Sequence, residues 1–416
     1  MLLSAKEKIY RMLRWSERYT KTDMVYLAEG GAWAVSGTGL SWLISFATVL
    51  AFANLIPKET YGTYQYILSM IGLFGILSLS GMGTAIARAT ARGQDGSLFF
   101  ALKTKIRWGL LGGVLSTLVG IYYLLQGNAT LGWGFIIAAI AIPFWEAPGL
   151  YINYAQGKKR FDISNLYDVG AQFLAATVII PVLYTSKNLL IILTAYLLSW
   201  GLARAFFFYI TVKQLPPNKE CDPNAIPYAK HLSVMSAVNS VSVNIDTILL
   251  WQITGPASIA SYIFAQSIPL RAAGLTKIIN RLAFPKMATQ DMRTIQNTLL
   301  YKVLLLCAPA ALAAGAYAVV APYIFYFFFP QYIEAVPLTQ LLSLLIVLQP
   351  LGLFLNALTS HAKQKLLYTY SFILPIFRIA VFLLLIPYFG VLGAVVGLVL
   401  IKAFDGLFLA WLFYQA

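Results

Sequence analysis

Charged residues, cysteines and histidines are scarce in this sequence, and each shortage excludes a class of protein. Asp, Glu, Lys and Arg make up 11% of the 416 residues, whereas 59% are hydrophobic and the mean hydropathy is +0.74. An average soluble domain has about 25% charged residues, so this composition indicates a membrane protein with many spans. Cys221 lies in a polar segment and Cys307 in an apolar run, an arrangement that predicts no disulfide, metal site or redox pair.

Sequence motifs of enzymes are also missing. The two histidines, His231 and His361, are far apart, and the sequence contains no HExxH motif, Walker loop or nucleophile elbow. The loops that we predict on the external side are too short for a soluble catalytic domain. We therefore expect neither enzymatic activity nor a cofactor.

Long apolar runs, in contrast, occur along the whole chain. A helix needs about 20 apolar residues to cross a bilayer, and the sequence contains twelve such runs, at 31–56, 61–86, 106–126, 131–155, 165–185, 188–211, 231–253, 258–280, 298–321, 337–358, 367–387 and 391–414. We predict an all-α polytopic membrane protein with twelve transmembrane helices in two six-helix lobes around a central cavity. The N-lobe comprises residues 31–211 and the C-lobe residues 231–416, and residues 212–230 form a cytoplasmic linker between them.

The net charge of +15 is distributed unevenly between the loops. The N-terminal segment and the loops after even-numbered spans hold most of the 30 Lys and Arg residues, whereas the opposite loops hold only Lys58 and Lys187. Because basic loops remain in the cytoplasm, we predict that both termini are cytoplasmic and that the basic excess reflects topology, not nucleic-acid binding. Residues 1–30 contain no signal peptide, and they fit either an amphipathic helix on an anionic membrane surface or a solvated arm.

Charged side chains inside the spans are the candidate functional residues, because a charge at mid-bilayer costs about 2.5 to 3.5 kcal/mol. The eighth span contains Arg271, Lys277 and Arg281. An arginine suits a buried anion because its planar guanidinium donates two parallel hydrogen bonds and stays charged, so Arg271 is the leading anion-binding candidate, with a structural ion pair as the alternative. A straight helix places Lys277 about 120° from Arg271, and both reach one ligand only if Pro269 and Gly274 bend the span.

The seventh span has a polar face. Ser236, Asn239, Ser240, Asp246 and Thr247 fall within a sector of about 120° on a helix. Such a face either lines a cavity in which Asp246 holds a cation or a proton, or forms a hydrogen-bonded contact between helices. Both interpretations remain open from the sequence.

Five further charges lie in or beside the spans. Arg378 has no acid at helical spacing and is the second anion candidate, whereas Lys402 and Asp405, at i and i+3, indicate an internal ion pair. Glu146 is predicted to be a coupling carboxylate or a structural acid. Arg204 is a further candidate for substrate binding.

Aromatic residues cluster near these charges in the sequence. They can stack on sugar rings or form the aromatic belt of a membrane protein. The cluster consists of Trp145, Tyr151, Tyr154, Trp200, Trp251, Tyr262 and Phe264. The predicted substrate-binding residues are therefore Arg271, Arg378, Arg204, Lys277, Asn239 and Tyr262.

Two segments are similar to those of a known family. The first is Asn54–Tyr64, NLIPKETYGTY, followed by Gly81-Met82-Gly83 and Arg88, and the second has Asp246, Gly255, Tyr262 and Ala265. Their Pro-x-x-x-Tyr-Gly-x-Tyr and Asp, Gly, Tyr-x-x-Ala patterns resemble those of the oligosaccharide flippases called Wzx in lipopolysaccharide pathways. The superfamily of these flippases also includes multidrug and toxin extruders and lipid II flippases.

The resemblance implies a bundle with a cationic central cavity. Such a protein moves undecaprenyl-pyrophosphate-linked oligosaccharide, such as an O-antigen unit, across the bacterial inner membrane by alternating access, and Arg271 and Arg378 would hold the pyrophosphate. The implied partners are this substrate, membrane lipids and a polysaccharide polymerase. The alternatives are a cation-coupled multidrug exporter, which would need mainly buried acids, a polysaccharide polymerase or ligase, and a non-transporting scaffold.

Overall fold

The computed structural model describes residues 24–271, 287, 290–361 and 363–416, with side chains from residue 37 onward except that of residue 38. Most of the predicted N-terminal segment, together with Lys277 and Arg281, lies outside these residues. Within them the regular elements are helices, with one isolated β-bridge between Asp95 and Cys221.

The helices follow the predicted spans along the chain. The first half contains α2 (Met24–Leu55), α3 (Lys58–Phe74), η1 (Gly75–Ser78), α4 (Met82–Ala91), α5 (Ser97–Leu125), α6 (Ala129–Trp145), η2 (Ala147–Gly149), α7 (Leu150–Gly157), α8 (Phe161–Thr185) and α9 (Leu189–Gln214). The second half contains α10 (Ala225–Thr254), α11 (Pro256–Gln266), α13 (Met292–Phe328), η3 (Pro330–Ala335), α14 (Val336–Leu342), α15 (Leu344–Leu348), η4 (Gln349–Gly352), α16 (Leu353–Ser360) and α17 (Gln364–Tyr414).

The predicted fold class is confirmed. In the described part of the chain eight helices are long and apolar enough to cross a membrane, and α3 and η1 with α4, bent by 48°, add a ninth if the bent pair is counted as one span. The 51-residue α17 leaves helical geometry at Gly390 (φ 54°, ψ −129°) and so contains the last two predicted spans. The described parts of α2 and α11 correspond to the first and the eighth span, and the protein is a multi-pass membrane protein.

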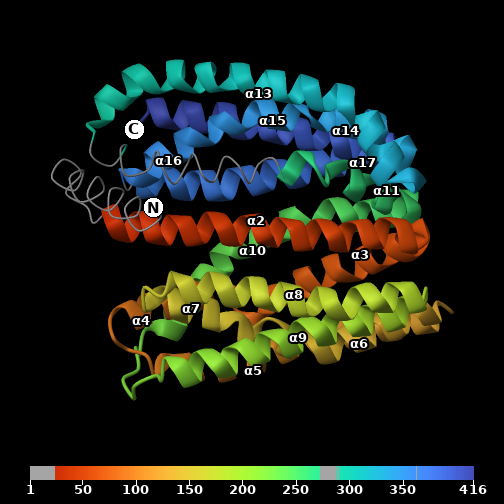
Figure 1. Cartoon of the computed structure of the whole chain (residues 1–416), viewed down its shortest axis with the longest axis horizontal. Helices are drawn as coiled ribbons and strands as arrows, with labels where there is room; N and C mark the ends of the chain where they lie inside the picture. The colour runs from red at the N-terminus through yellow and green to blue at the C-terminus, as the bar shows by residue number, and fades with distance from the viewer. Residues whose placement is uncertain (1–23, 272–286, 288–289, 362) are drawn as a thin grey trace, which may run out of the picture.

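The helices form two lobes (Figure 1). Helices α5 to α9 lie in one half of the view and α13 to α17 in the other, with α2, α3 and α10 between them. Within the N-lobe α5 packs on α6, and α8 packs on both α9 and α2. Helix α10 contacts α3 and α4 on one side and α17 on the other, so it joins the lobes.

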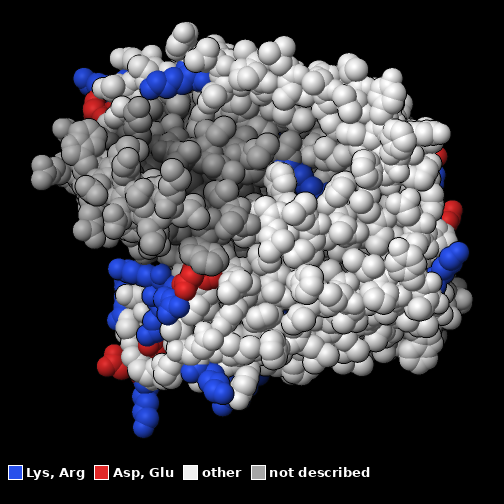
Figure 2. Space-filling view, viewed as in Figure 1, with Lys and Arg blue, Asp and Glu red and all other residues white. Residues whose placement is uncertain are grey.

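Charged side chains mark the two ends of the molecule (Figure 2). Lys and Arg gather at the end where α4, α7 and the C-terminus lie, and few charges appear on the broad surface between the ends. The middle of this surface is thus largely uncharged, as expected for a surface that faces hydrocarbon chains.

The linker between the lobes packs on the N-lobe. Its non-helical part comprises residues 215–224, less than the predicted 212–230, because α9 continues to Gln214 and α10 begins at Ala225. Asn218 Oδ1 accepts a hydrogen bond from the Asp95 backbone N–H at 3.1 Å, and Tyr154 donates from its hydroxyl to the Leu215 carbonyl at 2.9 Å. These bonds satisfy polar groups of the linker and fasten it to the N-lobe.

The two lobes meet tightly at the opposite end of the molecule, where α3 packs against α11 and η3. The Tyr61 and Phe264 rings stack with their centroids 4.7 Å apart, and Lys58 Nζ lies 2.6 Å from Glu334 Oε1. A Cβ atom on Gly62 would lie 1.8 Å from the Pro256 carbonyl oxygen, so only glycine permits this approach. We call this contact the α3–α11 seam and define it by Lys58, Tyr61, Gly62, Pro256, Phe264 and Glu334.

Candidate functional site

Arg271 lies directly after a break in the eighth span. Helix α11 ends at Gln266, and Ser267 and Ile268 form a turn before Pro269. Proline lacks a backbone N–H and interferes with the preceding helical turn, which explains the break at this position. The break separates Arg271 from the regular helical register of α11.

The guanidinium of Arg271 lies between the lobes. Nη1 donates to the Ser267 carbonyl at 3.0 Å, and Nη2 donates to Ser45 Oγ of α2 in the N-lobe at 3.2 Å. Among the described residues no carboxylate forms a salt bridge with Arg271. Since a guanidinium has five N–H donors, Arg271 keeps donors and an unneutralised charge for a ligand.

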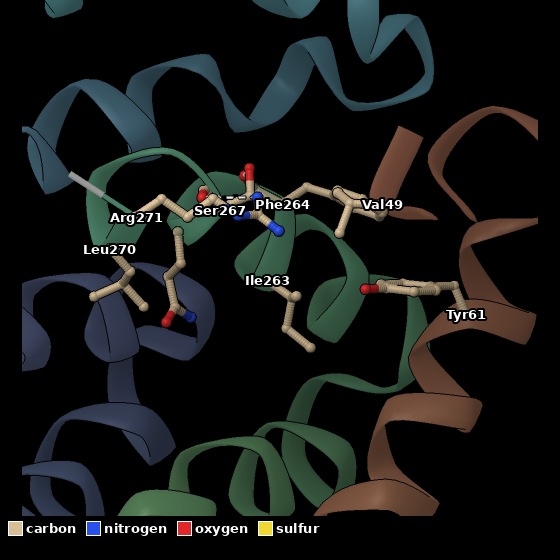
Figure 3. A pocket seen from close by; sticks show the side chains of 8 residues that line it. Val49, Tyr61, Ile263, Phe264, Ser267, Leu270 and Arg271 are labelled. Atoms are coloured by element: carbon tan, nitrogen blue, oxygen red, sulfur yellow. Dashed lines mark hydrogen bonds between the residues drawn. The ribbon is translucent and has the colours of Figure 1, made fainter. Parts of the chain in front are cut away.

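A pocket adjoins this guanidinium (Figure 3). It has a volume of about 250 Å³. Tyr61 points its hydroxyl from α3 toward the side chains of α11. The pocket is smaller than the roughly 300–1,000 Å³ of drug-sized sites, and its size suits a small anionic group better than a whole oligosaccharide. Its lining residues come from both lobes: Val49, Tyr61, Ile263, Phe264, Gln266, Ser267, Leu270 and Arg271.

Asp246 and Arg378 form a separate cluster with Tyr262. Tyr262 donates from its hydroxyl to Asp246 Oδ2 at 2.7 Å, and Arg378 Nη2 lies 3.9 Å from the same oxygen. Arg378 has no acid at helical spacing on α17, and the acid beside it, Asp246, comes from α10. This arrangement is the hydrogen-bonded helix contact that the sequence left as one of two interpretations. Neither Arg378 nor Tyr262 lines the pocket.

The remaining polar face of α10 contacts the N-lobe. Ser236 Oγ lies 2.7 Å from Ser80 Oγ, and Ser233 Oγ accepts from the Gly81 backbone N–H at 3.0 Å. Asn239 is exposed and does not line the pocket at Arg271. The polar face of α10 thus includes inter-lobe hydrogen bonds in addition to the buried Asp246.

Glu146 and Arg204 lie together inside the N-lobe. Glu146 Oε2 is 3.3 Å from Nζ of Lys105, and Arg204 Nη1 donates to the Trp145 carbonyl at 3.0 Å. That carbonyl belongs to the last residue of α6, so Arg204 caps the broken helix. Arg204 does not line the Arg271 pocket, so it does not contact a ligand that is bound there.

Lys402 and Asp405 lie next to each other in the C-lobe. Lys402 Nζ is 2.7 Å from Asp405 Oδ2, the pairing that their spacing indicates. Tyr370 donates from its hydroxyl to Asp405 Oδ1 at 2.8 Å. Both oxygens of Asp405 thus have partners within the lobe.

The sequence analysis did not identify two residues that contact the predicted site residues, Lys105 and Ser45. Lys105 comes just before the predicted third span, 106–126, but it is buried in α5. Its helical phase could have revealed this, because Ala101 and Gly109, four residues to either side, are small residues on the same face. Ser45, the N-lobe partner of Arg271, has no comparable signal in the sequence.

Comparisons with known proteins agree with this architecture. The family of polysaccharide biosynthesis proteins matches residues 27–290. A protein of Methanocaldococcus jannaschii, described as an uncharacterized membrane protein, is 21% identical, and the match covers 92% of this chain and 82% of that protein.

Solved structures of similar fold come from the MOP superfamily. The inward closed conformation of the lipid II flippase MurJ has a TM-score of 0.69 at 12% identity and covers 91% of this chain and 87% of that one. The inward-facing conformation of a multidrug resistance MATE family transporter has a TM-score of 0.63 at 14% identity, with 90% and 94% covered. At such low identity these likenesses show the shared fold.

Proposed function

The chain belongs to the family of polysaccharide biosynthesis proteins, and from this membership we propose that it is a lipid-linked oligosaccharide flippase. In this proposal the protein moves an undecaprenyl-pyrophosphate-linked oligosaccharide, such as an O-antigen or other surface polysaccharide unit, across the bacterial inner membrane. The two lobes alternate between openings to either side, and both termini remain cytoplasmic. The gathering of Lys and Arg at the end where the C-terminus lies supports this orientation.

The observation that carries the proposal is Arg271, which lies in a pocket between the lobes and has no carboxylate partner among the described residues. A cation buried without a carboxylate is costly in a membrane protein, and an anionic ligand offsets that cost when it binds. A pyrophosphate fits the remaining donors because guanidinium groups bind phosphate oxygens through parallel hydrogen bonds. The pocket is lined by both lobes, so a ligand there contacts both moving parts.

The other predicted residues take different parts in this proposal. Arg378 and Tyr262 hold Asp246 and orient α10, α11 and α17 around the site. Lys277 is proposed as a second cation for the pyrophosphate. The sugar chain extends away from Arg271, and the lipid tail remains in the bilayer.

Translocation of a defined substrate tests the proposal. Reconstituted in proteoliposomes, the full chain should move fluorescently labelled undecaprenyl-pyrophosphate-linked oligosaccharide between leaflets, and Arg271→Ala should reduce the rate by at least about tenfold, or roughly 1.4 kcal/mol. Arg160→Ala is the matched control, because Arg160 is exposed and pairs with Asp162 far from the pocket. Equal rates for wild type and Arg271→Ala would contradict the assignment of the anion site.

A multidrug exporter of the same fold is the second candidate, and the pairing of three acids inside the spans disfavours it. Glu146, Asp246 and Asp405 each lie within 4.0 Å of a basic side chain. Such acids are already neutralised and do not favour a cationic drug. Transport of a cationic dye, without transport of the lipid-linked glycan, would replace the proposed function with this one.

A further inference from the structure

Four charged side chains from four segments lie at similar depth inside the N-lobe. Lys105 belongs to α5, Glu146 to the break between α6 and α7, Asp168 to α8 and Arg204 to α9. Each is about seven to eleven residues from the end of its helical segment on the basic side, or roughly 10–17 Å at 1.5 Å per residue. We call these four residues the N-lobe charge layer.

Opposite charges alternate within this layer. Glu146 pairs with Lys105 at 3.3 Å, and Asp168 and Arg204 lie on the packed helices α8 and α9. With two basic and two acidic side chains the formal charges of the layer sum to zero, whereas Arg271 in the pocket between the lobes has no carboxylate partner among the described residues. It offers both donors and acceptors to a polar ligand without selecting for an anion.

Aromatic rings flank the layer. The Arg204 guanidinium carbon lies 4.9 Å from the Trp200 ring centroid and 5.6 Å from that of Trp145. Tyr196 contacts both indoles, with centroid distances of 6.3 Å to Trp200 and 6.2 Å to Trp145. Tyr196, Trp200 and Arg204 follow one another at intervals of four residues, so they share one face of α9.

This aromatic face points into the lobe. The exposed side chains of α9 lie on the other side of the helix. At 100° per residue, Leu198 and Leu202 are each about 160° from Trp200, and Tyr209 is about 140° from Tyr196. Those three exposed side chains face lipid. The aromatic rings around Arg204 therefore lie on the side of α9 that faces the interior of the N-lobe, where they are partly buried.

Glu146 remains partly exposed at this depth. Its side chain is 42% exposed, whereas that of its partner Lys105 is 7% exposed. A carboxylate in the membrane does not face hydrocarbon, and the exposed Ile140 and Phe144 occupy another face of α6. The exposed part of Glu146 consequently faces the inside of the lobe, where a hydroxyl group can reach it.

A chain of aromatic contacts connects the layer with the Arg271 pocket. Tyr61, which lines the pocket, lies 6.1 Å from Tyr64, and Tyr64 lies 5.4 Å from Tyr196, measured between ring centroids. Tyr196 then contacts the indole of Trp145. Only a few ring contacts therefore separate the layer from the Arg271 pocket.

We propose that the N-lobe charge layer, with Trp145, Trp200 and Tyr196, binds the neutral sugar part of the substrate while Arg271 binds its pyrophosphate. This inference rests on the proposed function. A pyranose ring has an apolar face that packs on an indole and a rim of hydroxyl groups that need donors and acceptors. The charge-balanced layer supplies both, and Arg271 supplies the net positive charge for the phosphates.

The test compares binding of two lipids to the purified full chain in nanodiscs. The probes are undecaprenyl pyrophosphate and undecaprenyl-pyrophosphate-linked N-acetylglucosamine. Wild type should bind the glycosylated lipid about tenfold more tightly, and Trp200→Ala and Glu146→Gln should each remove most of this preference while leaving affinity for the bare lipid unchanged. Trp133→Ala is the matched control, because Trp133 is exposed on α6.

The other possible outcomes distinguish a failure of the sugar site from a failure of the anion site. Three results would overturn the sugar site. They are a full preference for the glycosylated lipid in both variants, an equal loss of affinity for both lipids, and no preference in wild type. Trp200→Phe, which keeps a ring, should retain part of the preference if stacking is the cause. Unchanged binding of both lipids by Arg271→Ala would instead contradict the anion site of the proposed function and leave the sugar preference measurable.

Discussion

Arg271 and Arg378 have different surroundings although both are arginines inside predicted spans. Within the described residues Arg271 donates to the neutral oxygens of Ser45 and Ser267 and forms no salt bridge, so its charge remains available. Arg378 faces the buried carboxylate of Asp246, which Tyr262 also contacts. The type of residue predicts a cation at each position, and the neighbouring helices decide whether that cation can serve a ligand.

The pairing of Asp246 with Arg378 predicts how single residues at these positions affect the stability of the protein. Asp246→Ala should destabilise the protein by about 2–4 kcal/mol, because removing one member of a buried pair leaves the other charge uncompensated. The double variant Asp246→Leu/Arg378→Met should be closer to wild type, since both charges are then absent. Thermal unfolding of the full chain in detergent measures both effects. A double variant less stable than Asp246→Ala would contradict this account.

Breaks within helices shape the site at the scale of elements. Helix α6 ends at Trp145, where Arg204 caps its last carbonyl, and α11 ends just before Pro269 and Arg271. Gly255, with φ of 85°, makes the turn between α10 and α11 in a conformation that favours glycine. These breaks place side chains at positions that straight helices would not reach.

Gly62 gives a prediction for the contact between two elements. Gly62→Ala should weaken the α3–α11 seam, because the new Cβ atom would lie 1.8 Å from a backbone oxygen of Pro256 that has little freedom to move. We expect a destabilisation of about 1–3 kcal/mol, as for other overpacked sites, measured as a lower unfolding temperature. Gly201→Ala in α9, where no atom lies within 4 Å of the added Cβ, should be neutral or stabilising. Equal effects of the two substitutions would contradict the steric argument.

At the scale of the whole molecule, the seam joins the lobes at the end remote from the linker. Lys58 pairs with Glu334 at 2.6 Å, and Ser261 donates to the same carboxylate oxygen at 3.0 Å. Asn54 adds two contacts across the lobes, donating to the Phe328 carbonyl and accepting from the Gln331 side chain. In alternating access these contacts must separate when the protein opens at this end.

Charge exchange tests this role of Lys58 and Glu334. Lys58→Glu and Glu334→Lys should each shift the protein away from the closed seam, and the double variant should restore closure. The Glu334 side chain is 60% exposed, so the shift should be only a few-fold, as for exposed pairs worth about 0.2–1 kcal/mol. The rate of disulfide formation between cysteines at Asn54 and Gln331, in a chain with Cys221 and Cys307 replaced by serine, measures closure.

Lys187→Glu serves as the matched control, because Lys187 forms no salt bridge within the described residues. It should leave the cross-linking rate unchanged. Failure of the double variant to recover the wild-type rate would argue against an electrostatic contribution to the seam.

The sequence alone determined the features that depend on neighbouring residues. The lengths of the apolar runs predict the spans because crossing hydrocarbon requires a fixed length of helix. Lys402 and Asp405 were paired correctly because i, i+3 residues meet on any helix. The choice of Arg271 as the leading candidate depended on the same local logic, since a charge inside an apolar run requires a polar neighbour.

Only the tertiary structure decided which helices supply the partners. Arg378 meets Asp246 of α10, Lys105 meets Glu146 beyond α6, and Arg271 meets Ser45 of the other lobe. Helical phase shows which residues share a face, but packing between helices decides what that face contacts. The distinction between the unpaired Arg271 and the paired Arg378 therefore appears only in the folded protein, because the relevant distances join residues that are remote in the sequence.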